Sequence, residues 1–207
     1  MILLLELAQF MKQFDNDEAC RSFLFDMRWS GSFFCPRCDS NRYSYIKTRQ
    51  LYECLDCRAQ ISVTAGTVMH GTKLPLSYWI FTFCWVASEE PCTASRLAAT
   101  LKLNYRSASR MLRAVRLAMK SCNGFHPLSH IKQPKESLQT EPEPIVECAT
   151  KITLRKAQQF IRFVYRGVSS EYLQYYVDEY YFRRTRPTLF KQAVSNLLNA
   201  ALRTLPG

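Results

Sequence analysis

The stretch CPRCDSNRYSYIKTRQLYECLDC, residues 35–57, decides the local fold of the N-terminal part of this chain. A Cys-x2-Cys pair stands at each end, and fifteen residues separate Cys38 from Cys54. Each pair can form a tight knuckle that offers two thiolates to one side of a metal, and two facing knuckles complete a tetrahedron around Zn2+. The spacing predicts one structural zinc per chain, bound by Cys35, Cys38, Cys54 and Cys57, with no open position for a reacting water.

The remaining cysteines favour a reduced protein over a disulfide framework. The chain has nine cysteines, an odd number, and five lie outside the two pairs: Cys20, Cys84, Cys92, Cys122 and Cys148. Most of them fall in apolar stretches with helical patterning, which suits free thiols in a reducing compartment. A redox role for one pair would need a βαβ pattern, and none precedes Cys35. We therefore interpret the paired cysteines as a zinc ribbon, with a purely structural scaffold as the alternative role.

The chain of 207 residues is strongly basic, with a formal net charge of +11. Four thiolates and one Zn2+ lower this charge to about +9, because the metal offsets two of the four negative charges. Residues 41–120 hold 12 Lys and Arg against 4 Asp and Glu, whereas residues 1–40 hold 4 against 6. A basic segment beside a zinc ribbon favours a nucleic-acid partner, since phosphate contacts release condensed counterions. A charged surface that serves solubility alone is the alternative.

No stretch of the sequence has the pattern of a membrane span or a signal peptide. Glu6 interrupts the apolar run from Ile2 to Leu5, and no basic residue precedes that run. The uncharged stretch 74–88 contains Pro75 and is too short to cross a bilayer. We expect no membrane partner and, because the free thiols suit a reducing compartment, a cytoplasmic protein.

Hydrophobic periodicity predicts a mainly α-helical protein with a small β zinc ribbon. Two short helices are expected within residues 2–28, with a break near 15–17 where Asp15 or Asn16 can cap the second. The expected strands are 33–34, 43–46, 51–53 and 61–63, and the expected helices that follow are 78–88, 93–101 and 105–120. The last two helices, joined by a turn at Leu103–Asn104, have the outline of a helix-turn-helix.

The helix expected at residues 105–120 has two chemically different faces. At 100° per residue, its five cations share an arc of about 120°, and apolar side chains occupy the opposite arc. Residues 91–120 contain no Asp or Glu, which argues against an ordinary solvated face of mixed charge. This pattern is typical of a recognition helix in a major groove, where early residues reach bases and later ones reach phosphates. The predicted DNA-binding residues are Tyr105, Arg106, Ser107, Arg110, Arg113, Arg116 and Lys120.

Residues 121–150 separate this region from a second helical part. They contain four prolines and four glutamates with little periodicity, which indicates a linker. Beyond them we expect a basic amphipathic stretch at 151–166, a tyrosine-rich helix ending near Arg184, and a last helix at 188–202. The predicted domains are 1–72 with the N-terminal helices and zinc ribbon, 73–121 with the helix-turn-helix, 122–150 as a Pro-rich linker, and 151–207 as a helical tail.

Several of these motifs resemble the N-terminal zinc-ribbon region of bacterial insertion-sequence transposases. The motifs are Cys35-Pro36-Arg37-Cys38, Leu51-Tyr52-Glu53-Cys54, Thr64-Ala65-Gly66-Thr67, Lys73-Leu74-Pro75-Leu76 and Trp79. The resemblance covers residues 10 to about 120, and the segment from Tyr165 to Arg183 is similar to the end of the same proteins. It implies binding to double-stranded DNA at transposon terminal inverted repeats, a nucleoid-associated location in a bacterium, and an RNase H-like core with a DDE-type metal-binding triad.

Three departures from the family pattern shape the functional expectation. Asp39 stands where the family favours glycine, and Arg184-Thr185-Arg186 stands in place of an asparagine-arginine-arginine run. Between the two similar regions, only residues 121–150 are not already assigned to an expected helix, too few for the sheet that carries the triad. We therefore identify no catalytic residue and expect an internally deleted, zinc-dependent DNA-binding protein without strand cleavage. The alternatives are an active DDE-type transposase and a zinc-ribbon module that binds protein; the apolar seams of 151–207 could also support a homo-oligomer.

Overall fold

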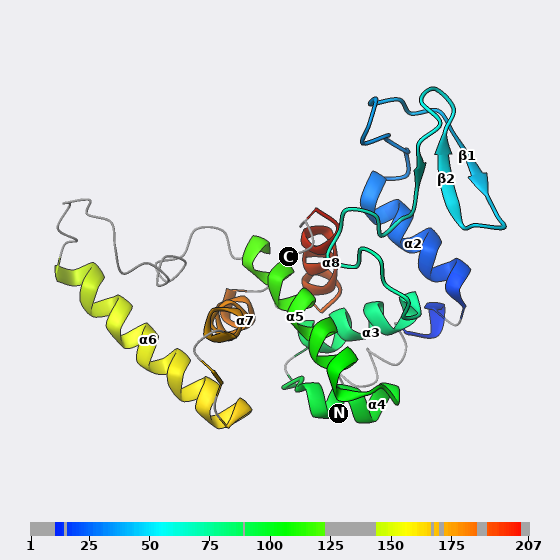
Figure 1. Ribbon diagram of the computed structural model, residues 1–207. Helices are drawn as coiled ribbons and strands as arrows, with labels where there is room; N and C mark the ends of the chain where they lie inside the picture. Colours follow the sequence, from blue (N-terminus) through cyan, green and yellow to red (C-terminus); the bar gives the residue numbers. More distant parts are fainter. Residues whose placement is uncertain are drawn as a thin grey trace.

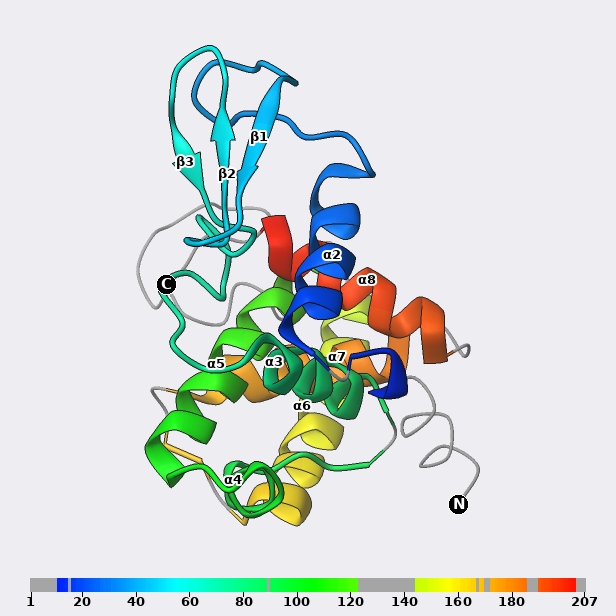
Figure 2. The ribbon, with the colours of Figure 1, turned by 90° about the vertical axis from the view of Figure 1, so that its right-hand side faces the viewer.

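A three-stranded zinc ribbon stands on a body of helices in the computed structural model of this chain (Figures 1 and 2). The structure describes residues 11–14, 16–88, 90–122, 144–166, 168–169, 172–185 and 190–203. The predicted fold class, mainly α-helical with a small β zinc ribbon, is confirmed.

The ribbon sheet is antiparallel, with strand order β1-β2-β3. Its strands are β1 (Tyr43–Ile46), β2 (Leu51–Cys54) and β3 (Gln60–Ile61). In the register of the sheet, Tyr52 on the central strand pairs with Tyr45 on one side and with Ile61 on the other. These strands lie close to three of the predicted ones. The fourth prediction, a strand at 33–34, was wrong, since Phe33 and Phe34 have no strand assignment.

The first of the two predicted N-terminal helices lies mostly at residues 1–10, outside the described ranges; the other helices agree with the predicted segments, with shifted ends. They are a short 3-10 helix η1 (Lys12–Phe14), then α2 (Asp17–Trp29), α3 (Leu76–Ala87), α4 (Ala94–Leu101), α5 (Tyr105–Cys122), α6 (Pro144–Tyr165), α7 (Leu173–Thr185) and α8 (Phe190–Arg203). Asn16 caps α2 by accepting a 2.8 Å hydrogen bond from the Ala19 N–H, and Asn104 caps α5 in the same way through Ser107. Residues 144–150 were predicted as linker but begin α6, and residues 123–143 lie outside the described ranges.

The main core joins segments that are far apart in the sequence. Helices α3 and α5 contact α8, which also packs against α2 (Figure 2). The seam of α8 is buried in this core through Ala193, Val194, Leu197, Leu198, Ala201 and Leu202. Because this seam is covered, it is not available to a second copy of the chain. The domain boundaries stay a prediction, but α8 is packed with helices that we had placed in other domains.

Helix α2 connects the ribbon to the body. Its Phe25 and Trp29 rings lie 4.7 and 5.6 Å from the ring of Tyr52 on the sheet, and Trp29 lies 5.2 Å from Phe33. The Arg28 guanidinium donates a 2.7 Å hydrogen bond to the Val63 carbonyl, just after the last strand. Edge-to-face and tilted ring contacts of this kind stabilise beyond the area that they bury. The ribbon is therefore seated on α2 by an aromatic cluster.

Helix α6 lies at the edge of the molecule, beside α7 (Figure 1). Its Ile161 is buried in a small second cluster with Val177 of α7. The tyrosine-rich helix α7 contributes to packing, since Tyr180 is buried and Tyr176 packs against this cluster. Among the residues that the structure describes, no helix is both long and apolar enough to cross a membrane.

Candidate zinc centre and basic helix

The four predicted metal ligands converge on one point of the ribbon. Their sulfur atoms all lie within 4.8 Å of one another, with 3.6 Å between Cys35 and Cys57 and 3.5 Å between Cys38 and Cys54. A tetrahedron with Zn–S bonds of 2.3 Å has edges of about 3.8 Å, close to these separations. The thiolate set therefore fits one structural zinc, which confirms the predicted cofactor.

The two knuckles repeat the same backbone pattern. In each, the N–H of the first cysteine, Cys35 or Cys54, donates to the carbonyl five residues later at 2.9 Å. Its carbonyl accepts from the N–H four residues later, at 2.9 Å from Asp39 and 3.0 Å from Arg58. Both of these donors are left-handed, with φ of 61° and 58°. The left-handed conformation at Asp39 fits a position where the resembling family favours glycine, whereas the residue type of Arg58 gives no signal for the matching turn.

Backbone donors prepare the second knuckle for a metal. The N–H groups of Cys57 and Asp56 donate to the Cys54 sulfur and lower the pKa of Cys54 to about 6. Because zinc binds thiolates and not thiols, these donors favour the form that the metal takes. Cys35 and Cys54 are buried while Cys38 is exposed, so the metal would lie at the edge of the ribbon.

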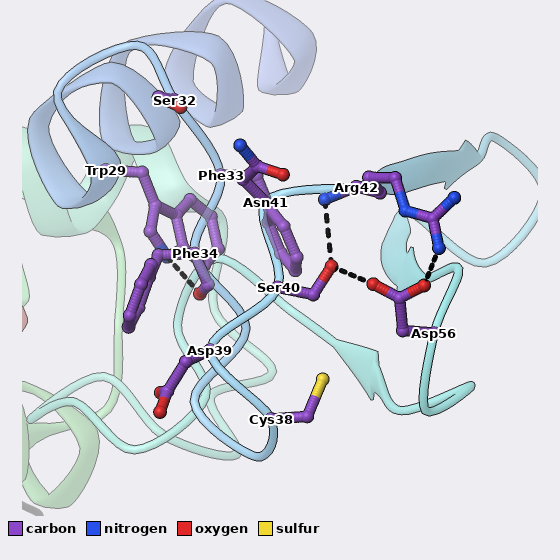
Figure 3. Close-up of a pocket in the computed structure, with 10 residues that line it drawn as sticks. All are labelled: Trp29, Ser32, Phe33, Phe34, Cys38, Asp39, Ser40, Asn41, Arg42 and Asp56. Atoms are coloured by element: carbon purple, nitrogen blue, oxygen red, sulfur yellow. Dashed lines mark hydrogen bonds and ion pairs between the residues drawn. The ribbon is translucent and has the colours of Figure 1, made fainter.

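A side-chain link joins the two knuckles beside the metal ligands. Ser40, which follows the first knuckle, donates to the carboxylate of Asp56 in the second, and that carboxylate also pairs with Arg42 (Figure 3). Nearby, the Trp29 indole donates a 3.0 Å hydrogen bond to the Phe34 carbonyl. These groups line an open hollow of about 810 Å³ next to Cys38. The bonds of Ser40 and Arg42 to Asp56 hold the two knuckles together, and the Trp29 bond fixes the segment before Cys35 to α2.

Helix α5 buries its apolar face and exposes most of its basic face. The apolar side chains predicted for the core are all buried: Ala108, Met111, Leu112, Val115, Ala118 and Met119. Of the predicted DNA-binding set, five side chains are exposed, namely Tyr105, Arg106, Arg110, Arg113 and Lys120, and Ser107 is half-buried in the first turn. Arg113 also lies over the ring of Tyr172, at 4.7 Å.

Arg116 is the exception and corrects the predicted face. It is 6% exposed, and its Nε donates a 2.8 Å hydrogen bond to Glu179 of α7. Its guanidinium also lies 4.1 Å from the ring centre of Tyr176. A guanidinium in this position cannot reach a phosphate unless α7 moves, so we remove Arg116 from the set of proposed DNA contacts.

Glu179 is the centre of a buried polar cluster that sequence reasoning missed. Its carboxylate accepts from Arg116, from Tyr165 at 2.5 Å and from Arg183 at 3.0 Å. Burial alone would raise the pKa of Glu179, but the charges of Arg116 and Arg183 lower it overall. Arg183 also donates to the carbonyls of Ser88 and Glu90. The cluster ties α5, α6 and α7 to the loop before α4.

Comparison with known proteins relates the chain to insertion-sequence transposases through its ribbon. Residues 15–60 match the family described as transposase zinc-ribbon domain. A protein of Halobacterium salinarum, named as an uncharacterized protein in transposable element ISH50, is 25% identical over 111 residues. That match covers 51% of this chain and 38% of the relative's length. No solved structure matches the chain significantly.

Proposed function

We propose that this protein is a transposase-derived, zinc-dependent DNA-binding protein that recognises double-stranded DNA at transposon terminal inverted repeats. The observation that carries the proposal is the exposed cationic face of α5, which has no carboxylate from residue 91 to residue 120. Electrostatic attraction to phosphates follows from such a face whatever the DNA sequence. The ribbon match supports the origin of the protein in a transposase.

The first turns of α5 are the part that we assign to DNA. Tyr105 is 63% exposed, and Arg106 and Arg110 lie on the same side of the helix. In helix-turn-helix proteins the N-terminal residues of the second helix contact base edges, while the first helix crosses the backbone. In this protein α5 would contact base edges and α4 would cross the backbone. Lys102, in a left-handed conformation, ends α4 before the turn into α5.

The test is duplex binding by the native protein and by Arg110→Ala plus Arg113→Ala, two exposed arginines beyond the first turn that we assign to phosphates, measured by fluorescence anisotropy from low to high salt. A duplex obtained by selection from a random pool serves as ligand. The logarithmic salt slope should fall by about two, because each lost phosphate contact removes about 0.9 from it. Lys12→Ala plus Arg203→Ala, an equal loss of exposed charge elsewhere, is the matched control. An unchanged slope for the α5 variant would remove α5 from the interface.

We further propose that the protein binds DNA without cutting it, as an internally deleted relative of active transposases. Its support is that Asp178 and Glu179, the carboxylates of α7, are 2% and 1% exposed, and that Glu179 is already neutralised by two arginines. A two-metal mechanism needs carboxylates that face a metal pair. Nicking of inverted-repeat DNA by the purified protein with Mg2+ or Mn2+, abolished by EDTA, would overturn this part of the proposal.

A further inference from the structure

The outward face of α6 carries a second group of exposed cations. Arg155, Gln159 and Arg162 lie within an arc of about 60° at 100° per residue, and Arg166 follows directly after the helix. All four side chains are exposed, whereas Ala157 and Ile161 on the opposite side are buried. The helix therefore uses one face for packing and leaves the cationic face open.

No carboxylate offsets this charge within the segment. Residues 148–170 contain five Lys and Arg and no Asp or Glu. A solvated helix face usually mixes the two signs, because opposite charges four residues apart stabilise the helix. The adjoining α7 supplies Asp178 and Glu179, but both are buried. The face is thus complementary to a polyanion.

An exposed aromatic ring stands among the cations. Phe163 is 88% exposed, the largest exposed fraction among the large apolar side chains of the described ranges. Together with Arg155, Gln158, Gln159 and Arg162 it lines a shallow hollow of about 450 Å³. Arginine and glutamine make paired hydrogen bonds to guanine and adenine edges, and a phenylalanine ring can contact the thymine methyl group in the major groove. Solubility alone explains the arginines but not the phenylalanine beside them.

We propose that the outer face of α6 is a second DNA-binding element that contacts the same duplex as α5. This inference rests on the proposed function, since it assumes duplex DNA as the partner. Arg155 and Arg162 are separated by roughly 10 Å along the helix axis, about three base-pair steps of one strand. Each can reach a phosphate, and Phe163 and Gln159 lie beside them to contact sugar or base edges.

The buried cluster fixes α6 relative to α5. Tyr165, near the end of α6, donates to Glu179, which also accepts from Arg116 of α5. Its ring lies 4.5 Å from that of Tyr176 in α7. When one of two linked faces has bound a duplex, the other face is held close to the same duplex, so its binding occurs at a high effective concentration. Affinity then exceeds that of either face alone.

The experiment measures duplex affinity and salt slope for Arg155→Ala plus Arg162→Ala beside the native protein, the α5 variant and the Lys12/Arg203 control. We expect affinity at 0.1 M salt to fall tenfold or more, and the slope to fall by about two. Arg155→Lys plus Arg162→Lys should keep the native slope, because the charges remain. Both sites are exposed, so far-UV circular dichroism should stay unchanged and confirm that the variants fold.

The outcomes separate this inference from the proposed function. Loss of binding in the α5 variant alone overturns the role of α6 and leaves the proposed function standing. Loss in the α6 variant alone supports α6 and removes α5. If the native protein binds no duplex, both fail. If Phe163→Ala leaves DNA affinity unchanged but converts a dimer to a monomer in sedimentation, the face is an interface between copies and the inference is wrong.

Discussion

The zinc ribbon and the helical body of α3, α4, α5, α7 and α8 are stabilised in different ways. The ribbon is local: its ligands and strands all fall between residues 35 and 61, and backbone hydrogen bonds shape its knuckles. The body joins helices from the middle of the sequence, α3 to α5, to the C-terminal helices α7 and α8 through an apolar core and one buried ion cluster. A short segment without a large core depends on its metal, whereas the body depends on long-range packing.

The largest effect should come from the metal. Chelation of zinc, or Cys54→Ser, should unfold the ribbon and leave the helical body folded, because zinc binding supplies about 10–16 kcal/mol of folding energy in small zinc domains. Metal content and the near-UV circular dichroism of the aromatic cluster report on the ribbon. The far-UV helical signal reports on the body. Cys92→Ala, at a buried thiol outside the zinc site, should keep one zinc per chain. Joint loss of both signals would show that ribbon and body unfold as one unit.

The next largest effect should come from the ion cluster in the body. Glu179→Ala leaves Arg116 and Arg183 buried without their carboxylate partner, and we expect a loss of about 3–5 kcal/mol in the free energy of unfolding. Urea unfolding of the zinc-loaded protein measures it. The matched control is Glu53→Ala, which breaks the ribbon pair between half-buried Glu53 and exposed Arg58 and should change stability much less. Equal effects of the two substitutions would contradict the contrast between body and ribbon.

The same carboxylate should make the body sensitive to acid. The pKa of Glu179 is lowered in the folded state, so its stabilising contribution is fully present above the unfolded value of about 4.3. That contribution is lost as the pH falls through the folded pKa. Urea midpoints of the helical signal should therefore decline below about pH 4, and Glu179→Gln should be less stable at neutral pH with a flatter acid decline. An unchanged decline would assign acid sensitivity to other groups.

The ribbon could be predicted from sequence because its determinants are local. The spacing of Cys35, Cys38, Cys54 and Cys57 fixes the ligand set, and the strands follow from the short loops between them. The body could be predicted only as separate helices. Arg116 has the periodicity of an exposed cation, and its partner Glu179 lies 63 positions away. No local sequence pattern predicts that α7 covers part of the basic face of α5, because the Arg116–Glu179 pair arises from tertiary packing.

The smallest effect concerns a strain that repeats in both knuckles. Arg58 is left-handed at φ 58°, a conformation that costs a residue with a Cβ roughly 1–2 kcal/mol, whereas glycine adopts it freely. Arg58→Gly should therefore bind zinc more tightly than Arg58→Ala, which loses the same side-chain pair with Glu53 but keeps the Cβ. The higher chain entropy of glycine in the unfolded state offsets part of this gain. We therefore expect a difference of about 1 kcal/mol, or roughly fivefold in zinc affinity, measured by competition with a chelator.

Since binding and folding of the ribbon are coupled, a difference of this size would show that the knuckle backbone contributes to the metal affinity. Equal affinities of the glycine and alanine variants would mean that the second knuckle relaxes out of the left-handed turn at no cost, and the backbone would then have no measurable part in stabilising the ribbon.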